Sequence, residues 1–352
     1  MGYFEKASAL QKNKDALILG IESSCDETAA SVVRGGREVL SNVIISSASE
    51  QAKYGGVVPE IASRAHTEAV SDAVTRAVKE AGITFKDLSA VAVTYGAGLL
   101  GALLVGVSYA KSLAFSLGLP LVPVSHIRGH MAAGYLESRE LEPPFITLLA
   151  SGGHTAIIKV DDYTKMSVLG GTMDDAVGEA FDKVARVLGL PYPGGPNVER
   201  LARHGKNVVP MPKMLKNQGG YNFSYSGLKT AVINYVHNME QKSEPYSRED
   251  VACSFQHSAV DVLCDKAVEA CEEYSLGTIV AGGGVAANGH LREYLTNKCA
   301  YKSIKLVLPQ KTMCTDNAAM IAAEGYIRYM NGDLADLTLN AKASVPLVAN
   351  AE

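Results

Sequence analysis

The sequence predicts an α/β protein built from two similar lobes. In each half of the chain, a short apolar run leads into a polar turn and a second apolar run, and segments with helical spacing follow. Strand–turn–strand units followed by helices are typical of layered α/β folds. The length of 352 residues fits two domains or one large bilobal domain.

The first half begins at residue 16. Residues 1–15 carry mixed charges and no apolar signal-peptide core, so we expect a flexible N-terminal extension. The apolar stretch Gly96–Ala110, which ends at Lys111, is too short for a membrane span. Apolar periodicity predicts strands at 16–21, 29–33 and 38–45, a helix at 60–81, a strand at 91–94, a helix at 99–117 and a strand at 121–124.

The second half repeats this theme. It predicts strands at 146–150 and 155–160, helices around 175–188, 197–205, 225–239 and 251–274, a strand at 278–281, a helix at 288–297, a strand at 304–308 and a last helix ending near 331. We therefore expect lobe I to contain residues 16–125 and 316–352, and lobe II to contain residues 126–315.

Charge and cysteine usage restrict the partners and the compartment. The formal net charge is −4, so a nucleic-acid partner must meet a local basic patch rather than a basic surface. The best candidate patch lies between Lys183 and Lys216, where Lys and Arg far outnumber the single acid Glu199. The six cysteines form no C-x-x-C pair, which favours reduced thiols and a cytoplasmic protein.

Three turns directly follow predicted strands, at residues 22–28, 151–154 and 282–284. Small residues there expose backbone N–H groups that can bind an anion. A single Gly-Gly turn commonly serves backbone geometry alone, but three in two lobes favour a nucleotide in the cleft between them. The chain has no G-x-x-x-x-G-K-[ST] loop, and 282–288 lacks the dinucleotide fingerprint.

His126 and His130 are spaced i, i+4, which puts two imidazoles on one helix face and suits two ligands of one metal ion. Histidines at this spacing also cap or pack helices. Ile127 stands where a zinc protease carries its glutamate, so metal-assisted transfer is favoured over proteolysis. Asp316, at the start of the last helix, is the candidate third ligand, and it is also a candidate N-cap.

Carboxylates cluster near two of the turns. Asp26 and Glu27 belong to the first turn, and Asp182 follows the second turn on a predicted helix, where it could bind ribose hydroxyls. For Asp174 and Asp175, we expect surface positions favoured by the dipole at a helix start.

Eight motifs occur in one order and together closely resemble the bacterial TsaD family, the tRNA adenosine threonylcarbamoyltransferases formerly called Gcp or YgjD. The resemblance runs from about residue 16 to 345. The motifs are Gly20–Ala29, Ser125–His130, Leu149–Thr155, Asp174–Lys183, Tyr192–Pro196, Phe223–Thr230, Gly282–Asn288 and Cys314–Asn317.

The resemblance implies the actin-like ATPase (ASKHA, actin/sugar kinase/Hsp70) fold, with two similar lobes around a nucleotide cleft. It implies transfer of the threonylcarbamoyl group from threonylcarbamoyl-AMP to the exocyclic amine of the adenosine 3′ of the anticodon. By position, it assigns Asp26 and Glu27 to catalysis, His126, His130 and Asp316 to the metal, and Leu149, Ala150, Ser151, Gly152, Gly153, Asp182, Gly195, Glu199 and Asn288 to the substrate.

The resemblance also implies one divalent metal ion per chain, iron or zinc, and ATP or ADP as further occupants of the cleft. The implied partners are the tRNA anticodon loop, TsaB as a paralogous dimer mate, TsaE as an ATPase and TsaC as the supplier of the adenylate. Two other functions remain open: a small-molecule kinase of the same fold and a nucleotide-gated scaffold.

Overall fold

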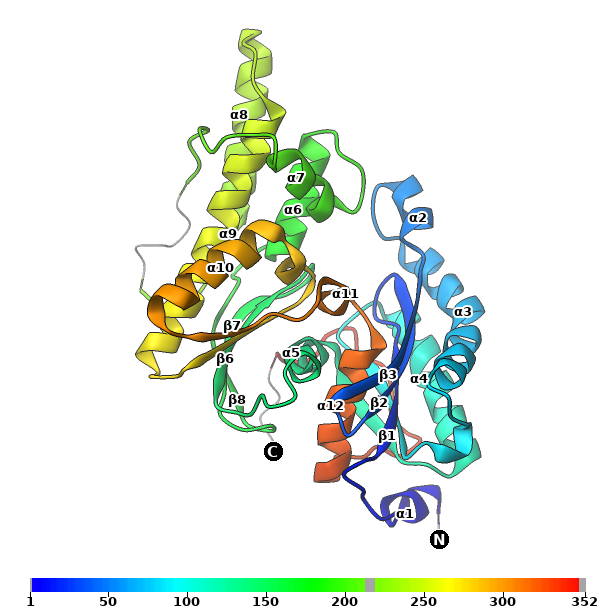
Figure 1. Cartoon of the computed structure of the whole chain (residues 1–352). Coiled ribbons are helices and arrows are strands. Elements are labelled where there is room, and N and C mark those ends of the chain that lie inside the picture. The colour runs from blue at the N-terminus through cyan, green and yellow to red at the C-terminus, as the bar shows by residue number, and fades with distance from the viewer. Residues whose placement is uncertain (1, 213–218, 348–352) are drawn as a thin grey trace. The chain divides into compact units, whose positions relative to one another are not determined.

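The structure is a computed structural model that describes residues 2–212 and 219–347. It divides into two compact units. Unit 1 comprises the described residues within Met1–Leu141 and Thr315–Ala349, and unit 2 comprises those within Glu142–Cys314. In the described residues each unit contains one five-stranded sheet, so both are α/β units (Figure 1).

Unit 1 supplies both ends of the described chain. Its elements are α1 (Tyr3–Ser8), β1 (Leu17–Glu22), β2 (Glu27–Arg34), β3 (Glu38–Ser46), α2 (Ala48–Gln51), η1 (Ala52–Tyr54), α3 (Pro59–Glu80), η2 (Phe85–Asp87), β4 (Ala90–Gly96), α4 (Leu100–Leu117), β5 (Leu121–Ser125), α5 (His126–Glu137) and α12 (Ala318–Asn331).

The sheet of unit 1 has the order β3-β2-β1-β4-β5. Strands β1 and β2 form the expected antiparallel hairpin, while β1, β4 and β5 run parallel. Helices α3 and α4 cover one face, and α12 packs on the other beside α5 (Figure 1). At Gly20 the backbone of α12 comes so close that a Cβ would lie 2.3 Å from Ala318 O, which explains a glycine inside a central strand.

Helix α4 contains most of the apolar stretch Gly96–Ala110, which by its length is too short for a membrane span. The helix begins one residue later than the predicted helix at 99–117, and its 18 residues are long and apolar enough to cross a membrane by length and composition alone. However, Leu103, Val107 and Ala110 are buried in the core between the sheet, α3 and α4. This packing identifies α4 as a covering helix of the unit 1 sheet.

The N-terminal residues are not the loose extension that the sequence predicts. Tyr3–Ser8 form α1, in which Ala7 is buried, and the Tyr3 hydroxyl donates to Leu119 O at 2.5 Å. Farther along, Lys12 Nζ donates to Met330 O. The expectation failed because an aromatic anchor and backbone hydrogen bonds hold this charged segment on unit 1.

Unit 2 occupies the middle of the chain. Its elements are β6 (Phe145–Ala150), β7 (Thr155–Val160), β8 (Met166–Gly171), α6 (Val177–Val187), α7 (Gly194–Ala202), α8 (Ser226–Lys242), α9 (Arg248–Glu273), β9 (Thr278–Gly282), η3 (Gly284–Ala287), α10 (Gly289–Lys302), β10 (Lys305–Val307) and α11 (Lys311–Cys314).

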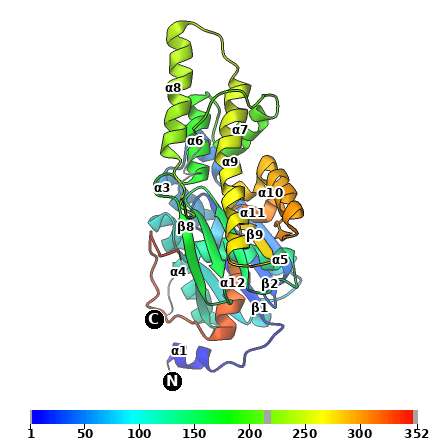
Figure 2. The ribbon, with the colours of Figure 1, turned by 90° about the vertical axis from the view of Figure 1, so that its left-hand side faces the viewer.

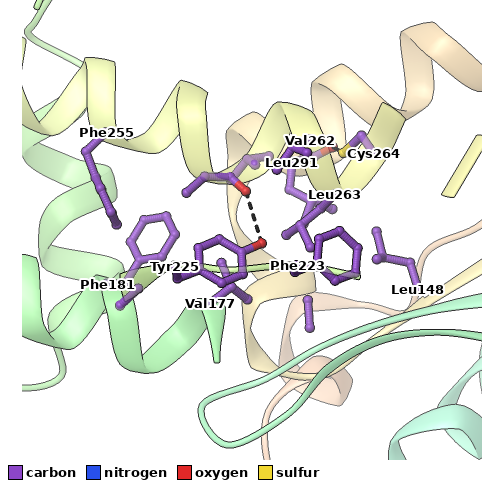
Figure 3. Packing of buried hydrophobic residues seen from close by; sticks show 14 of the residues in the cluster. Leu148, Val177, Phe181, Phe223, Tyr225, Phe255, Val262, Leu263, Cys264 and Leu291 are labelled. Atoms are coloured by element: carbon purple, nitrogen blue, oxygen red, sulfur yellow. Dashed lines mark hydrogen bonds between the residues drawn. The ribbon is translucent and has the colours of Figure 1, made fainter. Parts of the chain in front are cut away.

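The sheet of unit 2 has the order β10-β9-β6-β7-β8, with β6, β9 and β10 parallel and β7 antiparallel to β6. Helix α10 lies beside α9 in both ribbon views (Figures 1 and 2). Aromatic side chains tie the helices together. Phe181 and Phe255 meet edge to face at 4.9 Å, and the Tyr225 hydroxyl donates to Ala259 O (Figure 3). This core fixes α6, which carries the expected site residue Asp182, against α8 and α9.

The boundary between the units differs from the expected one. We expected lobe I to end at residue 125, but unit 1 continues to Leu141 because α5 packs against α12. One consequence matters for the site: His126, His130 and Asp316 all belong to unit 1.

Candidate metal and nucleotide sites

The candidate metal site lies where parallel strands of unit 1 end. Strand β5 ends at Ser125, and α5 begins at His126, so the helix start is placed at the carboxyl edge of the sheet. Strands β1 and β4 end at the same edge, and the Ser24 carbonyl accepts from Leu99 N there. This is the edge at which α/β folds collect functional groups.

The three expected ligands converge. His126 Nε2 lies 3.5 Å from Asp316 Oδ1, and His130 Nε2 lies 3.3 Å from the same oxygen. The ligand atoms are all within 4.8 Å of one another. Both histidines are buried, and Asp316 is partly exposed, so one side of the group remains open. The expected i, i+4 geometry on a helix is therefore confirmed.

The residues present fit a divalent cation. Neither ring nitrogen of the buried His130 makes a hydrogen bond within the described part of the chain. An unpaired buried polar group is costly, and a cation at Nε2 would satisfy it. Two imidazoles and one carboxylate are a donor set used for zinc and for non-haem iron, and they leave coordination positions for substrate.

Asp316 is not the helix N-cap that the sequence allowed. The cap of α12 is the neighbouring Asn317, whose side-chain oxygen accepts from Met320 N at 3.0 Å. A second short polar residue thus fills the capping position and leaves the Asp316 carboxylate directed at the histidines.

Two polar side chains that the sequence did not reveal contact His126 and orient its ring. Glu22 Oε2 lies 3.0 Å from His126 Nδ1 and also accepts from the Thr94 hydroxyl at 2.7 Å. Ser24 Oγ lies 3.1 Å from the same nitrogen. Because a carboxylate only accepts, Nδ1 carries the proton in this hydrogen bond and Nε2 is left for a metal.

The surroundings of the two histidines shift their pKa values in opposite directions. Burial alone would lower the pKa of His126, but Asp316 and Glu22 outweigh it and raise the pKa to about 9. Burial and the charge of His126 lower the pKa of His130. A single positive charge thus sits among two carboxylates, and a divalent cation can replace it.

Asp26 and Glu27 lie at the end of the first turn. Asp26 is buried, and its backbone oxygen accepts from Ser47 N and from the Ser47 hydroxyl. Burial, then Asp26 and Asp316, raise the pKa of Glu27 to about 9. Glu27 is therefore a protonated acid at neutral pH in the metal-free chain, electrostatically coupled to the metal group.

Unit 2 brings its two glycine turns together. Parallel β6 and β9 pair Leu149 with Gly282, so the turns at 151–154 and 282–284 leave the sheet side by side. Gly283 has φ +91°, and a Cβ there would lie 2.4 Å from Ala150 O. Gly178, at the start of α6, donates from its N–H to Ser151 O. Backbone groups thus crowd around Leu149–Gly153, which explains the small residues in and beside this turn.

The other expected substrate residues lie on helices of unit 2. Asp182 Oδ1 accepts from Gly194 N at 2.7 Å, which ties α6 to the start of α7. A Cβ on Gly195 would meet nothing within 4 Å, so that position is open. Glu199, on α7, pairs with Arg203 at 2.6 Å.

Asn288 caps α10, since its Oδ1 accepts from Leu291 N at 3.0 Å. Its Nδ2 donates to Gln256 Oε1 at 2.9 Å, a partner that the sequence did not single out. Glu199 also reaches this helix start, because its Oε1 would lie 3.0 Å from a Cβ on Gly289. The structure thus links Glu199 and Asn288 through the start of α10.

The expected basic patch and helix-start acids are largely engaged in other contacts. Lys183 pairs with both Asp175 and Glu179, while Lys213 and Lys216 lie outside the described residues. Asp174 does not serve the start of α6 as expected. Instead it accepts from the Ser224 and Ser226 hydroxyls and from Tyr225 N, and so holds the start of α8.

Solved structures with a similar fold define the class of this protein. HypF of T. kodakarensis superposes with a TM-score of 0.63 at 15% identity over 93% of this chain and 49% of that one. The A. fermentans (R)-2-hydroxyglutaryl-CoA dehydratase component A gives 0.53 at 13% over 90% of this chain and 99% of that one. At these identities the likeness shows the fold alone. The chain has the actin-like ATPase (ASKHA) fold, as predicted.

Sequence relatives identify the family within that class. The model of the family "TsaD: tRNA N6-adenosine threonylcarbamoyltransferase" matches residues 38–323. The protein of that name from Geobacillus kaustophilus (strain HTA426) is 51% identical over 96% of this chain and 99% of its own length. The one from Clostridium perfringens (strain SM101 / Type A) is 50% identical over 94% of this chain and 98% of its own length. The chain belongs to the TsaD family of transferases that modify tRNA, as predicted.

Proposed function

We propose that this enzyme transfers the threonylcarbamoyl group from threonylcarbamoyl-AMP to the exocyclic amine of the adenosine 3′ of the anticodon in tRNAs that read codons beginning with A. The amine nitrogen bonds to the carbamoyl carbon, the bond from that carbon to the phosphate oxygen breaks, and AMP leaves. The convergence of His126, His130 and Asp316 is the observation that carries this proposal.

The reaction requires the enzyme to align the adenine amine with the donor more than to activate the donor. Threonylcarbamoyl-AMP is a mixed anhydride and already reactive, whereas the adenine amine is a weak nucleophile because its lone pair is delocalised into the ring. The enzyme must therefore hold the two together and stabilise the developing oxyanion and the leaving phosphate. A loop base such as this one must be turned out of its stack to reach an active site.

The first unit supplies the metal ligands. His126, His130 and Asp316 would hold one divalent ion, iron or zinc, and the bound ion would act as a Lewis acid toward substrate oxygens. Glu22 holds the His126 ring in the orientation that offers Nε2. The partly exposed Asp316 leaves one side of the ligand set accessible.

Asp26 and Glu27 take complementary roles in this proposal. Asp26 accepts the proton that the amine loses on attack. Glu27, which keeps its own proton because its pKa is raised, donates a hydrogen bond and prevents a second negative charge beside Asp26. Glu27 therefore assists as a neutral acid rather than as a second base.

The second unit supplies the adenylate contacts. In the segment Leu149–Gly153, the N–H groups of Gly152 and Gly153 would bind phosphate, because Ser151 N already donates to His154 O. The open position at Gly195 would let the nucleotide approach the backbone. Asp182 and Glu199 would accept from ribose hydroxyls, and Asn288 would position the base. ATP or ADP would bind the same residues.

The enzyme would work in the cytoplasm with protein partners. We propose TsaB as its dimer mate, TsaE as an associated ATPase and TsaC as the source of the adenylate. A small-molecule kinase or a nucleotide-gated scaffold would use the same fold without a metal-dependent transfer to tRNA.

Reconstitution tests the proposal. Purified enzyme, threonylcarbamoyl-AMP, tRNA and the partner proteins are combined, and the digested nucleosides are analysed for threonylcarbamoyladenosine. We expect product with the wild type and strong loss with His126→Ala/His130→Ala. Equal product from both proteins would refute the metal role, and ATP-dependent phosphorylation of a small molecule without tRNA would favour the kinase.

A further inference from the structure

A second group of side chains that could hold a metal ion belongs to unit 2. His257 and Asp261 belong to α9, and His290 belongs to α10. One ligand atom from each lies within 4.8 Å of the others. His290 Nε2 is 2.7 Å from Asp261 Oδ1, and His257 Nδ1 is 3.7 Å from Asp261 Oδ2. The two rings lie with their centroids 4.0 Å apart.

The two helices hold these side chains in place. His257 and Asp261 are one turn apart on α9, so they share a face. Helix α10 packs along α9 and presents His290 two residues after its cap, Asn288 (Figure 2). The next turn of α10 is anchored to α9 as well, because the Tyr294 hydroxyl donates to Asp265 at 3.1 Å and Lys298 pairs with the same carboxylate.

The group is accessible and chemically complete. The side chains of His257, Asp261 and His290 are 33%, 31% and 16% exposed, so an ion and its waters can reach them. The Asp261 carboxylate faces His290 with one oxygen, to which it is hydrogen-bonded, and His257 with the other.

We propose that His257, Asp261 and His290 form a second, structural binding site for a divalent transition-metal ion such as Zn²⁺. Two imidazoles and a carboxylate suit such an ion, with water completing the coordination. The bound ion joins α9 to the first turn of α10.

The location gives the site a consequence for substrate binding. Gln256 immediately precedes His257, and it accepts the hydrogen bond from Asn288, two residues before His290. An ion that fixes α9 against α10 therefore also fixes the Gln256–Asn288 pair. We expect occupancy to stabilise unit 2 and to hold Asn288 in place.

Metal stoichiometry tests the proposal directly. The full chain is stripped of metal with a chelator and titrated with Zn²⁺, and bound metal is measured by equilibrium dialysis and mass spectrometry. We expect two equivalents in the wild type, one in His126→Ala/His130→Ala and one in His257→Ala/His290→Ala. Asp261→Asn, which keeps the side-chain shape, should weaken the second equivalent by about 10- to 100-fold.

A matched control separates the site from general histidine binding. His237→Ala removes an exposed histidine of α8 in the same unit, and it should leave both equivalents intact. Circular dichroism checks that each variant is folded, and the equivalent retained by unit 1 reports the same for His257→Ala/His290→Ala. A single equivalent in the wild type, or two in His257→Ala/His290→Ala, would overturn the proposal. Since zinc binding is the readout, its failure leaves the proposed transfer reaction untouched.

Discussion

Glu22 Oε2 lies 3.0 Å from Nδ1 of His126, and Glu22 itself is completely buried. The carboxylate fixes both the tautomer and the orientation of a metal-binding ring, although it does not reach the ligand atoms of the group. A carboxylate that accepts from the other ring nitrogen of a metal-binding histidine raises the basicity of that histidine and holds its orientation.

Glu22→Gln should therefore weaken metal binding without removing a ligand. The amide lacks the charge that supports the His126 Nδ1–H, so we expect the affinity of the unit 1 site for Zn²⁺ to fall by about 10- to 100-fold. A competition titration against a chromophoric chelator measures this. Glu38→Gln, which alters an exposed pair with Arg34 in the same unit, is the control. Equal affinities for Glu22→Gln and Glu38→Gln would show that Glu22 does not support the ligand.

Alanine substitutions at two glycines of unit 2 distinguish a glycine that the crowded backbone requires from a glycine that the nucleotide contacts. A Cβ on Gly178 would lie 2.7 Å from Ser151 O and Gly152 Cα, so Gly178→Ala must displace the turn. We expect at least a tenfold loss of AMP affinity, about 1.4 kcal/mol. Calorimetric titration of the folded variant with AMP measures it, and unchanged affinity would remove this turn from the nucleotide site.

Gly195→Ala is the informative counterpart, because the added methyl group meets no protein atom within 4 Å. The variant should keep the thermal stability of the wild type. If the nucleotide approaches this backbone as proposed, AMP binding should nevertheless weaken. Unchanged AMP affinity together with unchanged stability would show that Gly195 is not a contact.

Asn288 combines a helix cap with a proposed substrate contact. Asn288→Ala removes the acceptor for Leu291 N and should lower the free energy of unfolding by about 1 kcal/mol. Asn288→Asp keeps a capping oxygen and should retain most of the stability, yet it places a negative charge where the adenylate is proposed to bind. Urea unfolding and AMP titration distinguish the two effects. A similar loss of stability in both variants would contradict the capping role.

Glu27 predicts a pH dependence of stability. Its pKa is about 9 in the folded metal-free chain and near 4.5 when unfolded, so the folded state binds more protons between these values. Stability that depends on the protonated form is complete below about pH 4.5 and is lost as the pH rises toward 9. Glu27→Gln should remove the part of this decline that Glu27 causes and leave the part that His126 contributes above pH 6.5, because the pKa of His126 is also raised to about 9. Urea unfolding of the metal-free wild type and variant at pH 5, 7 and 9 checks it, and parallel curves would refute the raised pKa.

Local sequence signals were enough for most of the fold and for the convergence of the three candidate metal ligands. The i, i+4 spacing of His126 and His130 specifies its own geometry once a helix forms there. By contrast, Glu22 and Thr94 meet only because β1 and β4 pair in parallel, with Ile21 opposite Val93. Residues so distant in the chain leave no local signal, so the contacts of Glu22 with Thr94 and His126 could not be predicted.

The missed strand β8 has a different physical cause. It is an edge strand that ends in two glycines, and glycine reads as a turn signal in a sequence. In the structure Gly170 is required by the close passage of Tyr221, whose backbone would lie 2.3 Å from a Cβ at that position. The assignment of the Asp316 cap failed for a simpler reason, because Asn317 competes for the same role with equivalent chemistry.

The chain leaves unit 1 after Leu141 and returns at Thr315, so the two histidine ligands precede unit 2 and Asp316 follows it. A bound ion would therefore connect the segment before unit 2 to the segment after it, with the whole of unit 2 in the intervening loop. The three ligands meet only in the folded chain, so the free energy of metal binding adds to that of folding, and chelators should lower the free energy of unfolding as well as activity. During synthesis, coordination cannot be completed until the ribosome has already released unit 2, which makes metal capture a late event in maturation.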